Sequence, residues 1–507
     1  MSTASKILSN TVSQVIGKIF IAILALGSLK IATNYLSLQG YGEYVVIYEF
    51  LAFFGISADL GLFTIAVREM AKDEKQIPKI IGNVLSLRTF LVILTMIASV
   101  IIAYLVPKYQ GTRIPIGVAI ATITVFFTII NGTLSSVLQV KLKMHIASFA
   151  TVLGKALSVG AMFYVVMFGF PNDKEMGFYM LIMAGTLGTF LMLLTTNYYV
   201  RKITPLVYRF DFNFWKDVLM KSAPYGAALI LNTVYLRVGS LLLSVMVGQK
   251  EVGIYGVATR MLENFSILPL YFMNSVLPVL TREIAKKNEK YKNIISYSFD
   301  FLASMSIPLV AGGVVLAYPI VFIVSNPTFL SRLSEGFYGS DIAFQILIFA
   351  LLFQFLNVLF AFILIAVNKQ AKLLYINFFC VLLNVIGNVI FIPRYGIRSA
   401  AMMSVISELF ILVLTYAYAK KHLKFSINFL NLFKIIISAL IMGAAIYLLQ
   451  PITYKYVQNW NVILLVPFGM IIYAGMLFAT KVVNKNTLTL LRRGESRSEP
   501  EQIGPIN

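Results

Sequence analysis

Long apolar runs separated by short polar turns set the hydropathy pattern of this chain. A helix rises 1.5 Å per residue, so about 20 apolar residues cross the ~30 Å hydrocarbon core of a bilayer. One of these runs, residues 294–324, contains Pro308 and Gly312-Gly313, which predict a break in that helix. Fourteen runs are long enough to span a membrane: residues 12–36, 44–67, 84–106, 116–138, 146–168, 178–200, 223–247, 253–280, 294–324, 342–367, 373–392, 399–419, 432–449 and 462–479.

A short pattern recurs in the two halves of the chain. Gly42-Glu-Tyr44 lies at the start of the second run, and Gly253-Ile-Tyr255 lies at the start of the eighth, 211 positions later. Arg68-Glu69 is matched by Arg282-Glu283 at a similar offset of 214. Transporters are often built from parallel repeats of this kind. We therefore expect two homologous lobes in the same orientation; the alternative is that apolar helices resemble one another without being repeats.

The predicted fold is all-α and polytopic, with two six-helix lobes related by a pseudo-two-fold axis and two further C-terminal helices. We place the first lobe at 1–200 and the second at 219–420, joined by a polar, aromatic linker at 201–218. Tyr and Trp favour the headgroup level, so the linker is expected at the membrane interface. Residues 421–480 hold the last two spans, and the polar tail 481–507 is expected to be disordered.

Composition and charge agree with a membrane protein. Of 507 residues, 59% are hydrophobic and 12% are charged, and the mean hydropathy is +0.83, outside the range of soluble globular chains. The net charge of +21 would suggest a nucleic-acid partner in a soluble protein. With the N-terminus inside, however, 28 of the 42 Lys and Arg residues fall on cytoplasmic segments and eight on outer loops. The positive-inside rule explains this bias, predicts cytoplasmic termini, and makes a nucleic-acid partner unnecessary.

Ionisable residues within the spans are the candidates for function, because a charge in a membrane is costly unless it faces protein or water. We expect the cations to form a cationic central cavity that binds an anion: Lys18, Lys30, Arg88, Lys155, Arg237 and Arg260. The acids are candidates for ion coupling: Glu49, Asp59, Glu263 and Glu408.

A structural role is the alternative for each of these charges. Arg260 and Glu263 are i,i+3 on one helix face and could neutralise each other. The acids of the second span, Glu49 and Asp59, could be partners for Lys30 or Lys18. Cations near span ends, Lys18 above all, could instead extend to the interface.

No catalytic or metal-binding pattern accompanies these charges. The single cysteine, Cys380, lies in an apolar run, and His145 and His422 are the only histidines. The sequence has no P-loop, no G-x-S-x-G and no H-E-x-x-H. Its outer loops are short, which leaves little room for the acceptor site of a polysaccharide polymerase. We expect no enzyme activity, no metal site and no cofactor.

Several stretches resemble a known family. They are YLSLQGYGEYVVIYEF and ADLGLFTIAVREMAKD in the first half, LRVGSLLLSVMVGQKEVGIYGVATRM in the second, and NVIGNVIFIPRYGIRSAAMMSVISE near residue 400. Together they resemble the polysaccharide transporters, or Wzx-type flippases, of the multidrug/oligosaccharidyl-lipid/polysaccharide (MOP) exporter superfamily, over residues 10–480. Family members often carry an acid two places after the Arg of the Leu-x-Arg motif. Gly239 stands there, so a coupling role for that acid does not transfer.

The resemblance implies a flippase of the cytoplasmic membrane. Its cargo would be a polyprenyl-diphosphate-linked oligosaccharide, a repeat unit of O-antigen, capsule or exopolysaccharide, moved to the outer leaflet by alternating access. A proton or sodium gradient, or the membrane potential, would drive transport. A polysaccharide polymerase and a chain-length regulator would be partners. The alternatives are a drug/cation antiporter or a lipid II flippase of the same superfamily and, more remotely, a membrane polysaccharide polymerase.

Overall fold

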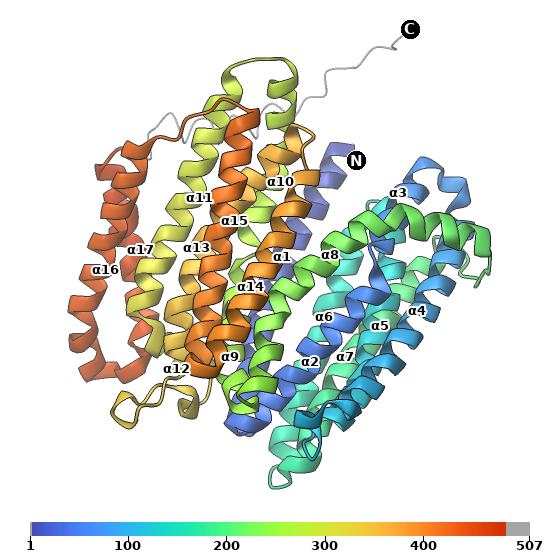
Figure 1. The fold of residues 1–507 in the computed structure, drawn as a ribbon, viewed down its shortest axis with the longest axis horizontal. Helices are drawn as coiled ribbons and strands as arrows, with labels where there is room; N and C mark the ends of the chain where they lie inside the picture. Colours follow the sequence, from blue (N-terminus) through green and yellow to red (C-terminus); the bar gives the residue numbers. More distant parts are fainter. Residues whose placement is uncertain (1–2, 483–507) are drawn as a thin grey trace.

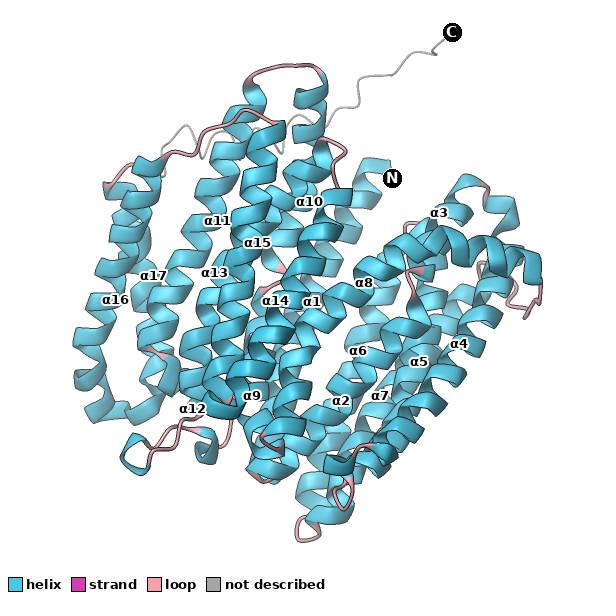
Figure 2. Ribbon diagram, viewed as in Figure 1, coloured by secondary structure: helices cyan, strands magenta, loops and turns pink. Residues whose placement is uncertain are grey.

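The computed structural model describes residues 3–482, with side chains from Ile16 onward, and every long element in that part is a helix (Figure 1; Figure 2). Thirteen stretches within it are long and apolar enough to cross a membrane. The last of them, Phe429–Ala479, contains two helices, α16 (Phe429–Val457) and α17 (Val462–Ala479), which pack against each other. Counted separately, they make the fourteen spans that the hydropathy pattern predicts. The predicted disorder of the tail beyond residue 482 lies outside the described residues.

The first lobe is the blue to cyan group of helices in Figure 1. Its helices pack on one another, most extensively α6 on α7 and α5 on α7, and α1 (Thr3–Tyr35) packs along α6. The other members are α2 (Leu38–Asp59), α3 (Leu62–Lys72), α4 (Ile77–Leu105), α5 (Ile114–Val140), α6 (Met144–Tyr164) and α7 (Lys174–Arg201).

The second lobe is centred on α13, which packs against α9, α10, α11 and α15. Helix α16 adds to it by packing on α11. Its members are α9 (Gln249–Phe265), α10 (Leu268–Ala285), α11 (Lys290–Val315), α12 (Ala317–Val324), α13 (Ser340–Ala366), α14 (Ala371–Tyr395) and α15 (Ile397–His422).

Helix α8 (Phe212–Met246) connects the two lobes and runs diagonally between them in Figure 1. Val218, in its first third, is buried in an apolar cluster with Leu62 and Leu87 of the first lobe. Further along, α8 packs against α14 of the second lobe and against α2 of the first. A single helix therefore contacts both halves.

The linker that was expected at 201–218 is shorter than predicted. Helix α8 begins at Phe212 because the Asp211 carboxylate caps it, accepting a hydrogen bond from the Phe214 N–H at 3.1 Å. The irregular segment before it is held on α4: the Arg209 N–H donates to the Ser86 hydroxyl at 3.0 Å, and the Asp211 N–H donates to Asn83 Oδ1 at 2.9 Å.

Three helix breaks differ from the hydropathy prediction. The second span divides at Leu60 and Gly61, which both have positive φ (42° and 75°), and the eighth divides at Ser266–Ile267. The ninth continues through Pro308 and divides at Leu316 instead of at the predicted site. These breaks depend on backbone dihedrals and on neighbouring helices, and average hydropathy contains no information about either.

The lobes meet at the end of the bundle opposite the N-terminus, the lower end in Figure 1. Helices α2 and α9 contact each other there almost backbone to backbone. A Cβ atom built on Gly42 would lie 1.7 Å from the Gln249 carbonyl oxygen, and one on Gly253 would lie 2.5 Å from the Leu38 carbonyl oxygen. Only glycine allows this approach. We call this end the closed end and the other the N-terminal end.

The close packing of α6 on α7 gives a prediction about stability. A Cβ on Gly188 would lie 2.4 Å from the Gly154 carbonyl oxygen, whereas a Cβ on Gly160 of α6 would meet nothing within 4 Å. Gly188→Ala should therefore lower the free energy of unfolding by about 1–3 kcal/mol through overpacking. Gly160→Ala should leave it unchanged or raise it by up to about 1 kcal/mol, because alanine favours a helix. Thermal unfolding of the purified proteins in detergent measures both, and equal stability of the two variants would contradict the packing.

Candidate functional site

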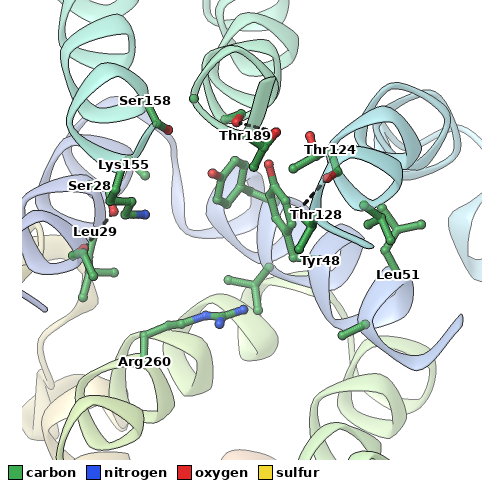
Figure 3. Close-up of a pocket in the computed structure, with 18 of the residues that line it drawn as sticks. Ser28, Leu29, Tyr48, Leu51, Thr124, Thr128, Lys155, Ser158, Thr189 and Arg260 are labelled. Carbon is green, nitrogen blue, oxygen red and sulfur yellow. Dashed lines mark hydrogen bonds between the residues drawn. The ribbon is translucent and has the colours of Figure 1, made fainter. Parts of the chain in front are cut away.

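A cavity of about 770 Å³ lies between the two lobes (Figure 3). Helices α1, α2, α5, α6 and α7 form its first-lobe walls, and the second-lobe side is formed by Arg237 of α8 with Arg260, Glu263 and Asn264 of α9. Its volume is within the 300–1,000 Å³ that is usual for small-molecule sites.

Much of the first-lobe wall carries hydroxyl and aromatic groups. Tyr41, Tyr44 and Tyr48 follow one face of α2 at i, i+3 and i+7, with ring centroids 6.2 and 5.0 Å apart along the series. Hydroxyls face them from the neighbouring helices: Ser28, Thr124, Thr128, Ser158 and Thr189. This wall offers ring faces and hydrogen-bonding groups to a polar ligand.

Lys155 of α6 also lines the cavity (Figure 3). Within the part of the chain whose side chains are described, its ammonium makes no hydrogen bond and no ion pair. The field of Arg260 reaches Lys155, so two positive charges act on the same space. Lys155 is thus a partly buried cation that can receive an anion without first losing a partner.

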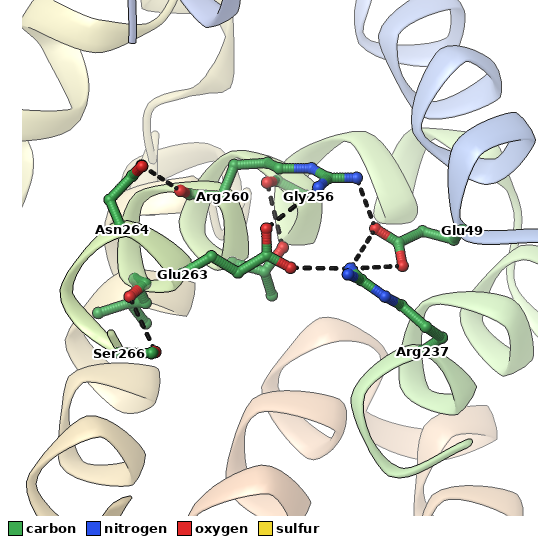
Figure 4. Close-up of polar contacts among 9 residues, drawn as sticks. Glu49, Arg237, Gly256, Arg260, Glu263, Asn264 and Ser266 are labelled. Carbon is green, nitrogen blue, oxygen red and sulfur yellow. Dashed lines mark hydrogen bonds and ion pairs between the residues drawn. The ribbon is translucent and has the colours of Figure 1, made fainter. Parts of the chain in front are cut away.

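Arg237 and Arg260 are held in a network with two carboxylates (Figure 4). Arg260 donates to Glu49 Oε1 at 2.8 Å and to Glu263 Oε2 at 3.1 Å. Arg237 Nη1 lies 2.9 Å from Glu49 Oε2 and 2.8 Å from Glu263 Oε1. The predicted i,i+3 pair of Arg260 and Glu263 is present, but it is one part of a four-residue network whose formal charges cancel.

The other three predicted cavity cations lie elsewhere. Lys30 donates to the carbonyl oxygens of Phe322 (3.0 Å) and Ser325 (2.6 Å) at the end of α12, where a cation suits the helix dipole. Arg88 is 3% exposed and bonds to Asp59 and Thr133. Lys18 is exposed. Among the described residues these three do not line the cavity, so the six cations do not form one site.

The alternative pairing of the second-span acids with Lys30 or Lys18 is not observed among the described side chains. Glu49 and Asp59 pair with neither Lys30 nor Lys18: Glu49 bonds the two arginines of the network, and Asp59 bonds Arg88. These pairings join distant segments, which a sequence pattern does not reveal.

Glu408 differs from the other acids. It is 6% exposed, and its carboxylate accepts from the Tyr235 hydroxyl at 2.9 Å and from Asn357 Nδ2 at 2.5 Å. No Lys or Arg among the described side chains pairs with it. A buried carboxylate with only neutral donors is costly when ionised.

The tyrosine and threonine lining was not predicted residue by residue. The tyrosines have a usable signal, since Tyr41, Tyr44 and Tyr48 recur at helical spacing beside Glu49. Thr128 and Thr189 have none, because isolated hydroxyls are common in membrane helices and only the packing of α5 and α7 shows which of them face the cavity.

Comparison with known folds agrees with this geometry. The chain is similar in structure to the lipid II flippase MurJ in an inward closed conformation, with a TM-score of 0.72 and 15% sequence identity. The match covers 94% of this chain and 100% of the MurJ chain. The chain is similar to an inward-facing multidrug-resistance MATE transporter of the MOP superfamily (TM-score 0.62, 14% identity, 81% and 97% covered). It is also similar to a MOP-superfamily transporter from Pyrococcus furiosus with a binding pocket of reversed polarity (TM-score 0.58, 15% identity, 82% and 95% covered).

Sequence comparison identifies the family. No curated protein sequence is significantly similar to the chain. The family model described as polysaccharide biosynthesis protein, however, matches residues 7–282, more than half of the chain, and the MatE model matches residues 224–390. The chain therefore belongs to the polysaccharide biosynthesis protein family, the polysaccharide transporters and flippases of the MOP exporter superfamily.

Proposed function

We propose that this protein is a flippase that moves a polyprenyl-diphosphate-linked oligosaccharide from the inner to the outer leaflet of the cytoplasmic membrane by alternating access. The observation that carries the proposal is the Lys155 ammonium, which has no hydrogen-bond or ion-pair partner among the described side chains and lies in a cavity walled by tyrosines and hydroxyls. Family membership supports a polysaccharide-related cargo.

The cavity has groups suited to each polar part of such a cargo. Lys155 would take a phosphate as an ion pair, and Arg237 and Arg260 offer planar donors that match phosphate oxygens. The ring faces of Tyr44 and Tyr48 and the nearby hydroxyls would bind sugars. The lipid tail would remain in the hydrocarbon between the lobes while the head group moves.

Orientation and driving force complete the proposal. Cytoplasmic termini, as the charge bias predicts, would put the closed end of the bundle at the outer leaflet, so the cavity would load from inside. Outward movement of one negative charge then gains ~2.3 kcal/mol per 100 mV of membrane potential, negative inside. ATP is not required. A polymerase and a chain-length regulator would receive the flipped cargo.

Two other cargoes remain as outcomes of the test. A lipid II flippase would use the same phosphate and sugar contacts, and MurJ has this fold. A drug/cation antiporter is less compatible with the lining, because the network of Arg237, Arg260, Glu49 and Glu263 is neutral and Lys155 adds a positive charge that would repel an organic cation.

The first test is flipping of a fluorescent polyprenyl-diphosphate oligosaccharide by proteoliposomes. We expect flipping without ATP, and a loss of about tenfold or more in Lys155→Met, because an ionic hydrogen bond contributes about 1.5–3 kcal/mol. Lys155 is a better target than either arginine, whose removal would also leave the buried Glu49 with fewer partners.

Lys18→Met is the matched control, since Lys18 is exposed and does not line the cavity. It should flip the substrate at the native rate. Equal rates for Lys155→Met and the native chain would show that Lys155 does not bind the cargo. Transport of lipid II alone, or of ethidium alone, would assign the protein to one of the two alternatives.

Lys30 gives a separate prediction, because the structure assigns it to helix packing. Lys30→Met removes the bonds to the Phe322 and Ser325 carbonyls and should lower the free energy of unfolding by about 1.5–3 kcal/mol. Flipping per folded molecule should stay at the native rate. A variant with native thermal stability but impaired flipping would show that Lys30 acts in transport and not in helix packing.

We also propose that Glu408 is the residue through which a proton gradient acts. A buried carboxylate that is shielded from water and accepts hydrogen bonds only from neutral donors is stabilised when it binds a proton or a cation. Glu408→Gln keeps the shape of the side chain and should abolish stimulation by an imposed pH gradient, while flipping driven by potential at equal pH continues.

The competing residue is Asp59, which is neutralised by Arg88. Asp59→Asn should retain the response to the pH gradient. If the response disappears in Asp59→Asn and survives in Glu408→Gln, coupling resides at the Arg88–Asp59 pair. Replacing the proton gradient by a sodium gradient in the same vesicles distinguishes the two ions.

A further inference from the structure

The ion-pair network lies at one end of a symmetric contact between α2 and α9. The sequence offset of 211 that relates Gly42 to Gly253 also relates Val45 to Gly256 and Glu49 to Arg260. The spacing within each helix is three and then four residues, which is the spacing of a parallel helix seam. We call these six residues the α2–α9 seam.

Equivalent positions of the seam meet each other. The Gly42 N atom lies 3.0 Å from the position of a Cβ on Gly253, and a Cβ on Gly256 would lie 2.9 Å from the Val45 side chain. One step further along, Arg260 donates to Glu49 at 2.8 Å. The pseudo-two-fold axis thus passes along the seam, and the seam ends at the cavity in an ion pair.

Glu49 has a property that no other member of the network shares. Arg237, Arg260 and Glu263 all come from α8 and α9, whereas Glu49 comes from α2 of the first lobe. The bonds of Glu49 to the two arginines therefore join the lobes, while those of Glu263 connect α9 to itself and to α8. The Glu49 side chain is 3% exposed, against 40% for Glu263.

We propose that Glu49 is an internal competitor for the transported anion, and that its displacement unlocks the seam; this inference rests on the proposed function. In the empty protein the Glu49 carboxylate occupies Arg237 and Arg260. A phosphate of the cargo takes its place on the arginines, the ionic link between the lobes is lost, and the closed end is free to open. Cargo binding and opening are thereby coupled at one side chain.

The same competition selects the cargo. The network is neutral as a whole, so among the described residues that line the cavity Lys155 is the cation that an entering anion can pair with directly. A single phosphate can pair with Lys155 and leave Glu49 in place. A diphosphate has a second phosphate to exchange for the Glu49 carboxylate. Glu49 is therefore a specificity-determining residue that favours diphosphates over monophosphates.

Affinity tests the competition. The probes are farnesyl diphosphate and farnesyl monophosphate, titrated calorimetrically into the purified protein. The native chain should prefer the diphosphate. Glu49→Gln, which keeps the shape and removes the charge, should bind the monophosphate about tenfold more tightly and so reduce the preference. An unchanged preference in Glu49→Gln would overturn the selectivity.

Opening of the closed end tests the unlocking. Lys108 and Lys250 are exposed at that end on different lobes, and the Lys108 carbonyl accepts from the Gln249 side chain. Spin labels at Lys108→Cys and Lys250→Cys, with Cys380→Ser as background, report the separation of the lobes by electron paramagnetic resonance. We expect a short separation in the empty protein and a longer one with farnesyl diphosphate.

Glu263→Gln is the matched control, because it removes one carboxylate from the same network without removing the link between lobes. Empty Glu49→Gln should show the long separation, and empty Glu263→Gln the short one. Equal separations in the two variants would overturn the proposal. If Glu49→Gln does not fold, the spin-labelled protein that retains Glu49 still tests the proposal. A separation that stays the same when farnesyl diphosphate is added would contradict the unlocking.

These readouts do not depend on the glycan. If binding and opening behave as expected but the lipid-linked oligosaccharide is not flipped, the role of Glu49 stands and the cargo assignment fails. If the oligosaccharide is flipped while Glu49→Gln behaves like the native chain, the flippase stands and the competition is wrong.

Discussion

The free-energy cost of an ionised group away from water organises the interior of this protein. Arg88 pairs with a carboxylate, and Lys30 donates to two backbone carbonyls. Arg237 and Arg260 pair with the same two carboxylates. Each arrangement supplies the partner that a charge needs in a low-dielectric region. Where the described structure leaves Lys155 without a partner, it also leaves a cavity. The candidate site is thus the place in the described structure where a partly buried cation within the spans has no ionic or hydrogen-bonding partner.

Two kinds of contact hold the lobes together, and they differ in how they can be undone. The glycine contacts of α2 with α9 are close and short-ranged, so a small separation of the helices removes them. The ionic contacts at Glu49 are directional and can be exchanged for those of another anion. Helix α8, which packs on both lobes, limits how the two halves can move relative to each other.

The sequence predicts the architecture well and the site only partly, for a physical reason. Span number depends on hydropathy, which is a local property, and the i,i+3 pair of Arg260 with Glu263 is local too. Lys30 and Lys155 look alike in sequence, since each is a lysine surrounded by apolar residues within a predicted span. One caps α12 and the other faces the cavity, and this difference arises from helix rotation and neighbours that are hundreds of residues away. The bond of Glu49 to Arg260 likewise depends on tertiary packing.

The placement of Glu49 opposite Arg260 also bears on how such a chain could have arisen. In a dimer of two identical half-length chains, a residue on the two-fold axis faces its own copy. Position 49 would then present either two glutamates or two arginines to each other, and like charges at that distance repel. Opposite charges at equivalent positions require two halves that can mutate separately. Duplication of the half-length gene, followed by divergence of the two copies, would therefore have been a precondition for this pair, and the asymmetry at the axis is a chemical property that no symmetric ancestor could have possessed.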